Sequence, residues 1–212
     1  MSDQRPSPPA WSRQERAVLR RLSTPRRIQD QLDQFAYRTE DAPTSPRRAL
    51  AERRAHCFDG ALLAAAALRF HGHPPLLLDL RATRDDDHVL ALFRVDRAWG
   101  AIAKSNFAGL RYREPIHRTL RELALSYFEP YYSLKRQRTL RAYSARPFDL
   151  RRFDRLGWEH DQAVAPRIAE ALDDGPHRLL LTPEQEGRLT RLDPRSFRAG
   201  MVGTDLAGVF RG

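Results

Sequence analysis

The chain contains a single cysteine, Cys57, at the start of the apolar run CFDGALLAAAALRF, which ends at Phe70. A cysteine acts as a nucleophile only as its thiolate, so it needs a lowered pKa and a base within hydrogen-bond reach. The first position of a helix favours the thiolate through unpaired backbone amides and the helix dipole. One such amide can also donate to an oxyanion. The simpler alternative is a small buried hydrophobic side chain, which is the commoner fate of a free cysteine.

The candidate base is His88, which directly follows the acidic run Asp85 to Asp87 at the expected start of a strand. The order of elements matters more than the residue type: a cysteine begins a helix, a strand follows, and a histidine begins the next strand. His56, His71 and His73 have no strand context, and we interpret them as structural. The three aspartates have poor ligand spacing for a cation, so we interpret them as a solvated loop and predict no metal site.

The hairpin after His88 predicts the position of a third catalytic residue. We expect Asp96 and Arg97 to form a two-residue turn between two strands. This turn sets Ser105 opposite His88, and Asn106 follows one residue along. The assignment depends on the turn length, because a slip of one residue exchanges the faces of the strand. A serine or an asparagine can hold an imidazole tautomer by hydrogen bonding, but neither stabilises imidazolium as an aspartate does.

Two arginines, Arg111 and Arg113, flank Tyr112 a few residues further on. Their planar guanidinium groups match a carboxylate in a bidentate way, so they could line a pocket that recognises an acidic group of a substrate. The alternative is that they form ion pairs with Glu114 or Glu122.

The residues around these positions predict an α+β protein. Ala61 to Leu68 is almost entirely apolar, so the helix that carries Cys57 should be buried on all sides. The glycine-rich end, residues 198–212, should be weakly structured. Spacing, caps and prolines predict helices at 13–22, from Pro25, from Pro46 to Leu50, at 57–70, from Pro115 to about Tyr127, at 162–172 and from Pro183 to about Leu192. Strands are expected at 76–82, 88–95, 98–103, 139–144 and 177–181.

The composition excludes several classes of protein. The apolar runs fall short of the roughly 18–20 residues that cross a bilayer, and residues 1–12 form a polar, proline-rich tail without a signal-peptide core. A single cysteine excludes an internal disulfide framework. We therefore expect a protein of a reducing, bacterial-type cytoplasm with no membrane partner. The net charge is +10, but the arginines are dispersed along the chain, so we expect at most non-specific affinity for nucleic acid.

The block from Arg53 to Phe107 resembles the core of the transglutaminase-like superfamily, whose fold is related to that of papain. The resemblance lies in RRAHCFDGALLAAAALRFHGHPPLLLDL, with a cysteine at a helix start, and in DHVLALFRVDRAWGAIAKSNF, with a histidine and a following tryptophan. The family's cysteine falls on Cys57 and its histidine on His88. Trp99 resembles the aromatic residue that commonly precedes the family's acidic residue, and we count it, with the two arginines, among the expected substrate-binding residues.

The chain departs from the family where that acidic residue would lie, because the local sequence is AKSN at 103–106. The departure leaves open a Cys-His-Asn arrangement like that of papain, a weakened dyad, or a core that no longer catalyses. The resemblance implies a cysteine-bearing helix packed on an antiparallel sheet that presents the histidine. By element order it extends over a core at 25–145, which leaves a tail and helix at 1–24 and an α-rich extension at 146–212.

The chemistry that the resemblance implies is covalent acyl transfer. The protein would be a cysteine hydrolase or acyl transferase that acts on a peptide-like or small-molecule amide through an acyl-thioester, without an organic cofactor or a metal. The alternative is a non-catalytic protein that keeps the fold and binds an anionic partner such as nucleic acid. The missing carboxylate and the positive charge favour this alternative, whereas the cysteine and the histidine favour the enzyme, which we prefer.

Overall fold

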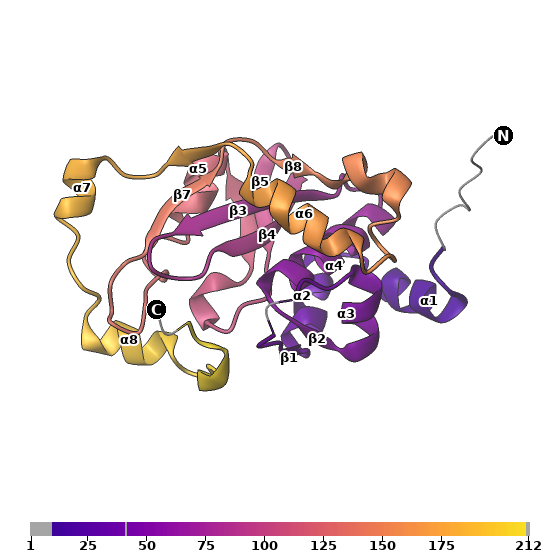
Figure 1. The fold of residues 1–212 in the computed structure, drawn as a ribbon, viewed down its shortest axis with the longest axis horizontal. Helices are drawn as coiled ribbons and strands as arrows, with labels where there is room; N and C mark the ends of the chain where they lie inside the picture. The colour runs from indigo at the N-terminus through magenta and orange to yellow at the C-terminus, as the bar shows by residue number, and fades with distance from the viewer. Residues whose placement is uncertain (1–9, 41, 211–212) are drawn as a thin grey trace.

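A seven-stranded antiparallel sheet forms the centre of the part of the chain that the structure describes, residues 10–40 and 42–210 of a computed structural model (Figure 1). Its strands run in the order β6-β5-β4-β3-β7-β9, and β8 pairs with the start of β3. A separate pair, β1 with β2, is parallel. The fold is therefore mixed α+β, as predicted. The strands are β1 (Ala36–Tyr37), β2 (Arg54–Ala55), β3 (Leu76–Ala82), β4 (His88–Val95), β5 (Ala98–Ile102), β6 (Arg113–His117), β7 (Leu140–Ser144), β8 (Phe148–Asp149) and β9 (His177–Leu179).

Helices pack on both faces of this sheet, because its central strands alternate their side chains between two cores. One core joins Leu77 and Val89 to residues of α1, α2, α4 and α6. The other joins Leu78 and Leu90 to residues of α5. The α-helices are α1 (Arg13–Arg21), α2 (Pro25–Asp33), α3 (Pro46–Glu52), α4 (Cys57–Phe70), α5 (Leu120–Leu125), α6 (Val164–Asp173), α7 (Pro183–Gly187) and α8 (Pro194–Gly200). The 3-10 turns are η1 (Ala108–Leu110), η2 (Leu150–Leu156) and η3 (Leu206–Gly208).

The first core crosses both of the segment boundaries expected from the sequence, at residue 24 and at residue 145. Leu19 from the N-terminal segment packs in the same core as Trp158 and Ile168 from the C-terminal one. Strand β9 also pairs with β7, so the predicted extension at 146–212 contributes a strand to the central sheet. Among the described residues, no helix combines the length and the apolar composition needed to cross a membrane.

Helix α4 spans the predicted residues and is buried on all sides, since every residue from Cys57 to Leu68 is buried. It ends where Gly72 takes a φ of +87°, a conformation that favours glycine. In the first turn, Gly60 lies against Lys104, so closely that a Cβ at Gly60 would be 2.4 Å from the Cβ of Lys104. Lys104 is itself fixed, because its buried ammonium group donates to two backbone carbonyls at the end of α2.

The β4–β5 hairpin has the predicted two-residue turn. Asp96 and Arg97 have φ angles of +46° and +69°, as a tight hairpin turn of this kind requires. The pairing of Ala91 with Ile102 follows the predicted register. Strand β5 ends at Ile102, however, so the pairing stops short of the start of β4, where His88 lies.

The helix expected from Pro115 is wrong at its beginning. Residues Arg113–His117 form strand β6, and the side chain of Ile116, expected on an apolar helix face, is 74% exposed. Helix α5 starts only after Thr119, whose side chain accepts a hydrogen bond from the backbone N–H of Glu122. This N-cap, and not the proline, sets the start of the helix.

The C-terminal part of the chain is more ordered than the sequence indicated. Helix α7 begins at Pro183, as predicted, but it ends at Gly187 instead of near Leu192. The end of α8 and the turn η3 lie among residues that were expected to be weakly structured. Figure 1 shows α7 standing away from the sheet, and the yellow C-terminal segment turning back after α8.

We predict that Gly60→Ala destabilises the protein, although alanine is the better helix former by about 0.5–1 kcal/mol. The new methyl group would overlap Lys104, whose ammonium group is fixed, so we expect a loss of about 1–3 kcal/mol of unfolding free energy in urea. Gly187→Ala is the matched control, because no atom lies near a Cβ at that position. Equal stability of the two variants would contradict the close approach of Gly60 to Lys104.

Candidate active site

The candidate nucleophile, Cys57, is the first residue of α4 and is only 6% exposed. Its sulfur lies 3.2 Å from Nδ1 of His56 and 3.8 Å from the carbonyl oxygen of Asp87. His88 begins β4 and lines the same hollow of about 40 Å³ as Cys57 and His56. The structure therefore brings together the two residues that the sequence paired. It adds His56, for which the sequence predicted only a structural role.

Both imidazoles favour the thiolate form of Cys57. Burial by itself raises the pKa of this thiol, but the charge and hydrogen bond of His56, followed by those of His88, lower its pKa to about 6. In return, the charge of Cys57 raises the pKa of His56 to about 9, against the opposing effect of burial. Asp59 and Asp86 contribute to the same rise. Both shifts therefore favour the thiolate of Cys57 beside the imidazolium of His56.

A backbone carbonyl holds His88 in one orientation. Its Nε2 lies 2.8 Å from the carbonyl oxygen of Leu110, in η1. A carbonyl oxygen only accepts, so Nε2 donates, and the lone pair of the neutral ring is on Nδ1. The rings of Tyr127 and Tyr131 pack edge-on against the imidazole, with centroids 6.3 and 6.4 Å away. When its ring carries no charge, His88 can therefore accept a proton at Nδ1.

Both residues expected to orient His88 have other partners. Ser105 lines the hollow, but its hydroxyl accepts a hydrogen bond from the backbone N–H two residues on. Asn106 binds the backbone of Asp205 and Gly208, near the end of the chain. These contacts correct the geometry expected from the hairpin. Its pairing stops at the end of β5, and the chain has left the sheet before it reaches Ser105.

Trp99, expected to contact substrate, lies away from the cysteine. It pairs with Arg94 across the hairpin, and the Arg94 guanidinium covers its ring at 4.5 Å. Arg94 follows His88 on the same strand at a separation that corresponds to roughly 20 Å. A small group bound to Cys57 would therefore be out of reach of Trp99.

The two arginines expected to recognise an acidic substrate group are bound within the protein. Arg111 forms an ion pair with Asp33 of α2 at 3.2 Å. Arg113 donates to the carbonyl oxygen of Gly109 at 2.8 Å and covers an aromatic ring of the second core. Burial lowers the pKa of Arg113. These contacts replace the expected binding role with a structural one, since Arg113 fixes the loop that presents the carbonyl of Leu110.

The acidic run before β4, expected to be solvated, is bound to its surroundings. Asp85 accepts a hydrogen bond of 2.6 Å from the hydroxyl of Thr139, and Asp87 accepts one of 2.7 Å from the N–H of Ala82. Burial raises the pKa of Asp87 to about 6 despite this hydrogen bond. Within residues 10–40 and 42–210, no group of three or more His, Cys, Asp or Glu side chains is arranged to hold a metal ion.

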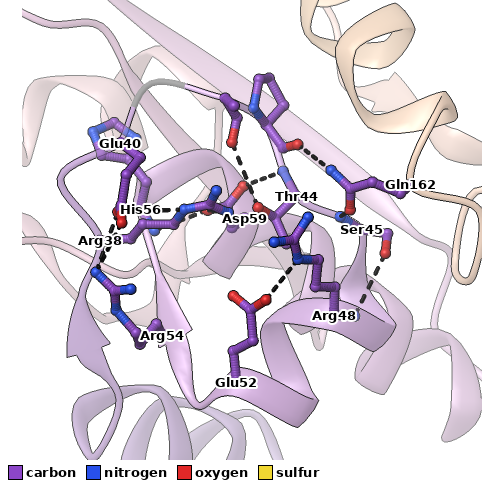
Figure 2. A network of polar contacts seen from close by, with 12 residues as sticks. Arg38, Glu40, Thr44, Ser45, Arg48, Glu52, Arg54, His56, Asp59 and Gln162 are labelled. Carbon is purple, nitrogen blue, oxygen red and sulfur yellow. Dashed lines mark hydrogen bonds and ion pairs between the residues drawn. The ribbon is translucent and has the colours of Figure 1, made fainter.

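Asp59, in the first turn of α4, fixes the backbone that carries His56 (Figure 2). Its buried carboxylate accepts hydrogen bonds from the N–H of His56 at 3.1 Å and from that of Thr44 at 2.7 Å. Arg38 approaches the same carboxylate at 3.8 Å. Gln162 binds the backbone on either side of Thr44, so the loop that covers the helix start is held from two directions.

A second hollow, of about 290 Å³, also reaches Cys57. Its wall includes Asp79, whose carboxylate lies 2.8 Å from Nε2 of His177. This hydrogen bond raises the pKa of His177. The sequence did not predict the pair, because 98 residues separate its members and only the strand order β3-β7-β9 brings them together.

No protein-family model matches the chain, and no curated protein matches it significantly. A function can therefore be inferred only from the chemistry of the site. A cysteine with a lowered pKa, an imidazole beside it and the first amide of a buried helix are groups that covalent acyl transfer uses.

We predict that alkylation of Cys57 by iodoacetamide has a midpoint near pH 6, because His56 and His88 hold the thiol as a thiolate. In His56→Ala the midpoint should move above about pH 8, because burial raises the pKa of the thiol and the charge of His56 no longer lowers it. Mass spectrometry of the labelled protein over a pH series measures both midpoints. His73→Ala, beyond the other end of α4, is the control and should leave the midpoint unchanged. A midpoint near 8.5 in the unaltered protein would rule out the thiolate–imidazolium pair.

We also predict that Asp59→Ala lowers the free energy of unfolding by about 1–3 kcal/mol for each buried N–H that loses its acceptor. Urea denaturation measures this loss. Asp30→Ala is the control, because Asp30 forms only an exposed ion pair with Arg26 and should change stability by about 0.5 kcal/mol or less. If both variants lose an equally small free energy of unfolding, Asp59 does not fix the start of α4.

Proposed function

We propose that the chain is a cysteine-dependent amide hydrolase or acyl transferase of the transglutaminase-like, papain-related type, and that it acts on peptide-like substrates. The observation that carries this proposal is the sulfur of Cys57 at the start of a buried helix, 3.2 Å from one imidazole and in one hollow with another. An ordinary buried cysteine has no need of two imidazoles, and burial alone would keep its thiol protonated.

In the first step, the Cys57 thiolate attacks the carbonyl carbon of an amide. A C–S bond forms and the carbonyl electron pair moves to the oxygen. The N–H of Cys57 lies in the first turn of α4, where backbone donors have no carbonyl partner within the helix, so it can stabilise this oxyanion. The His56 imidazolium gives its proton to the departing amine as the C–N bond breaks, which leaves an acyl-thioester on Cys57 and a neutral His56.

In the second step, neutral His88 takes a proton from a water molecule, or from an amine acceptor, at Nδ1. The oxygen or nitrogen of the acceptor forms a bond to the acyl carbon, the C–S bond breaks, and the thiolate is restored. Transfer of the proton from His88 to His56, past the sulfur that both rings influence, returns the site to its starting state. The two histidines thus have separate roles, an acid for acylation and a base for deacylation.

The partner of His88 sets the expected rate. The carbonyl of Leu110 fixes the tautomer of His88, but it carries no full charge and stabilises an imidazolium less than a carboxylate would. We therefore expect modest turnover. The positive charge of the whole chain is a separate property, because the larger hollow beside Cys57 is lined by the carboxylates of Asp79, Asp86, Asp87 and Asp173. An anionic partner would bind elsewhere, and sequence-independent nucleic-acid affinity stays a prediction.

We predict that p-nitrophenyl acetate leaves an acetyl group on Cys57, detectable by mass spectrometry after an acid quench, and that Cys57→Ala forms none. His88→Ala should still acetylate but should lose the acetyl group about 10²–10⁴-fold more slowly, because its base is missing. His56→Ala should acetylate slowly, because its thiol is largely protonated at pH 7. His73→Ala is again the control. Ester turnover that survives in Cys57→Ala would refute the proposal.

A further inference from the structure

The C-terminal segment, defined here as Asp205–Phe210, lies at the same hollow as the cysteine. Gly208 and Phe210 line this hollow together with Cys57 and His88. The segment follows α8 and includes the 3-10 turn η3. Figure 1 shows it turning back toward the body of the protein after α8. The end of the described chain thus meets Cys57 and His88 at one site.

The side chain of Asn106 holds the segment through the segment's backbone atoms. The amide Nδ2 donates to the carbonyl oxygens of Asp205 at 2.7 Å and of Gly208 at 3.1 Å. The amide oxygen accepts from the N–H of Asp205 at 2.8 Å. One side chain therefore satisfies three backbone groups of another stretch of chain, as an adjacent strand would. These three hydrogen bonds do not depend on the side chains of the segment.

The position of Gly208 admits no side chain. A Cβ there would lie 2.7 and 2.9 Å from two ring carbons of Tyr37 and 3.2 Å from Nδ2 of Asn106. The Tyr37 ring packs in turn against His56, with the centroids 5.4 Å apart. The wall that excludes a side chain at this point is therefore continuous with the imidazole beside the nucleophile.

The second hollow, of about 290 Å³, reaches Cys57 past Asp79 and Asp173 and is lined by no residue of the segment. On the segment's own side of Cys57, the hollow is too small for a substrate. Its volume is about 40 Å³, whereas pockets that bind small molecules usually measure about 300–1,000 Å³. The segment covers it with side chains that remain largely in solvent, since Leu206 is 61% and Phe210 is 42% exposed. Val209 is the one buried apolar side chain of Asp205–Phe210, so local opening of the segment exposes little apolar surface.

We propose that the groove between Tyr37 and Asn106 is a peptide-binding cleft that selects glycine, and that the C-terminal segment occupies it as an intramolecular competitor. The inference rests on the proposed function, because it takes the groove to be the substrate side of Cys57. The substrate class is then a polypeptide with a glycine two residues before an aromatic or large apolar residue, as in Gly208-Val209-Phe210. Its backbone would replace that of the segment at Asn106.

The test compares the full-length protein with Gly208→Val, in which the new side chain would collide with Tyr37 and expel the segment. We expect iodoacetamide to label Cys57 about tenfold or more faster in this variant, because the open fraction rises. Gly187→Val is the matched control, since a Cβ at Gly187 meets no atom, and it should label at the original rate. Asn106→Ala, which removes the three hydrogen bonds without a collision, should also label faster. Circular dichroism confirms that each variant is folded.

A synthetic peptide of residues 203–210, GTDLAGVF, added to Gly208→Val should restore slow labelling, and GTDLAVVF should not. Unchanged labelling in both Gly208→Val and Asn106→Ala would overturn the competitor. Equal protection by the two peptides would overturn the selection of glycine. The proposed function fails separately, since an alkylation midpoint near pH 8.5 in the opened variants would exclude a thiolate whatever the segment does.

Discussion

The start of helix α4 depends on one buried carboxylate. Asp59 lies in the first turn of a helix that is buried as far as Leu68, and an ionised carboxylate is stable there only if hydrogen bonds or opposite charges surround it. Two backbone N–H groups, those of His56 and Thr44, supply the hydrogen bonds, and Arg38 supplies charge. Because the N–H of His56 is held in this way, the residue before Cys57 takes the N-cap conformation, and its ring comes to the sulfur.

The charges around the sulfur balance in the same way. A buried thiolate is costly by itself, and the imidazolium of His56 compensates it. The carboxylates that line the larger hollow add negative potential. One of them, that of Asp86, raises the pKa of His56. Burial raises the pKa of Asp87, in the same lining, to about 6. The site thus combines the Cys57–His56 pair with neighbouring carboxylates, within a protein whose net charge is positive.

Local patterns in the sequence predicted the elements that depend only on neighbouring residues. The apolar run after Cys57 indicated the bounds of α4, and the Asp96-Arg97 turn indicated the register of the hairpin. The position of His56 beside the sulfur was not predicted, because that contact depends on Asp59 turning the backbone at the N-cap. The partner of His88 was missed for another reason: the carbonyl of Leu110 is a backbone group, and no residue type marks it. Whether the transglutaminase-like core describes this fold stays a prediction.

The asparagine at position 106 has a physical explanation that the sequence alone could not supply. It lies next to the position where the resemblance would place an acidic residue, and as a catalytic group it is a weak substitute. As the group that holds the C-terminal segment it is well suited, because the contact needs two donated hydrogen bonds and one accepted. A carboxylate only accepts, so an aspartate would face the carbonyl oxygens of Asp205 and Gly208 without a proton to share. The amide is therefore matched to a peptide backbone, and the orientation of His88 is left to the carbonyl of Leu110.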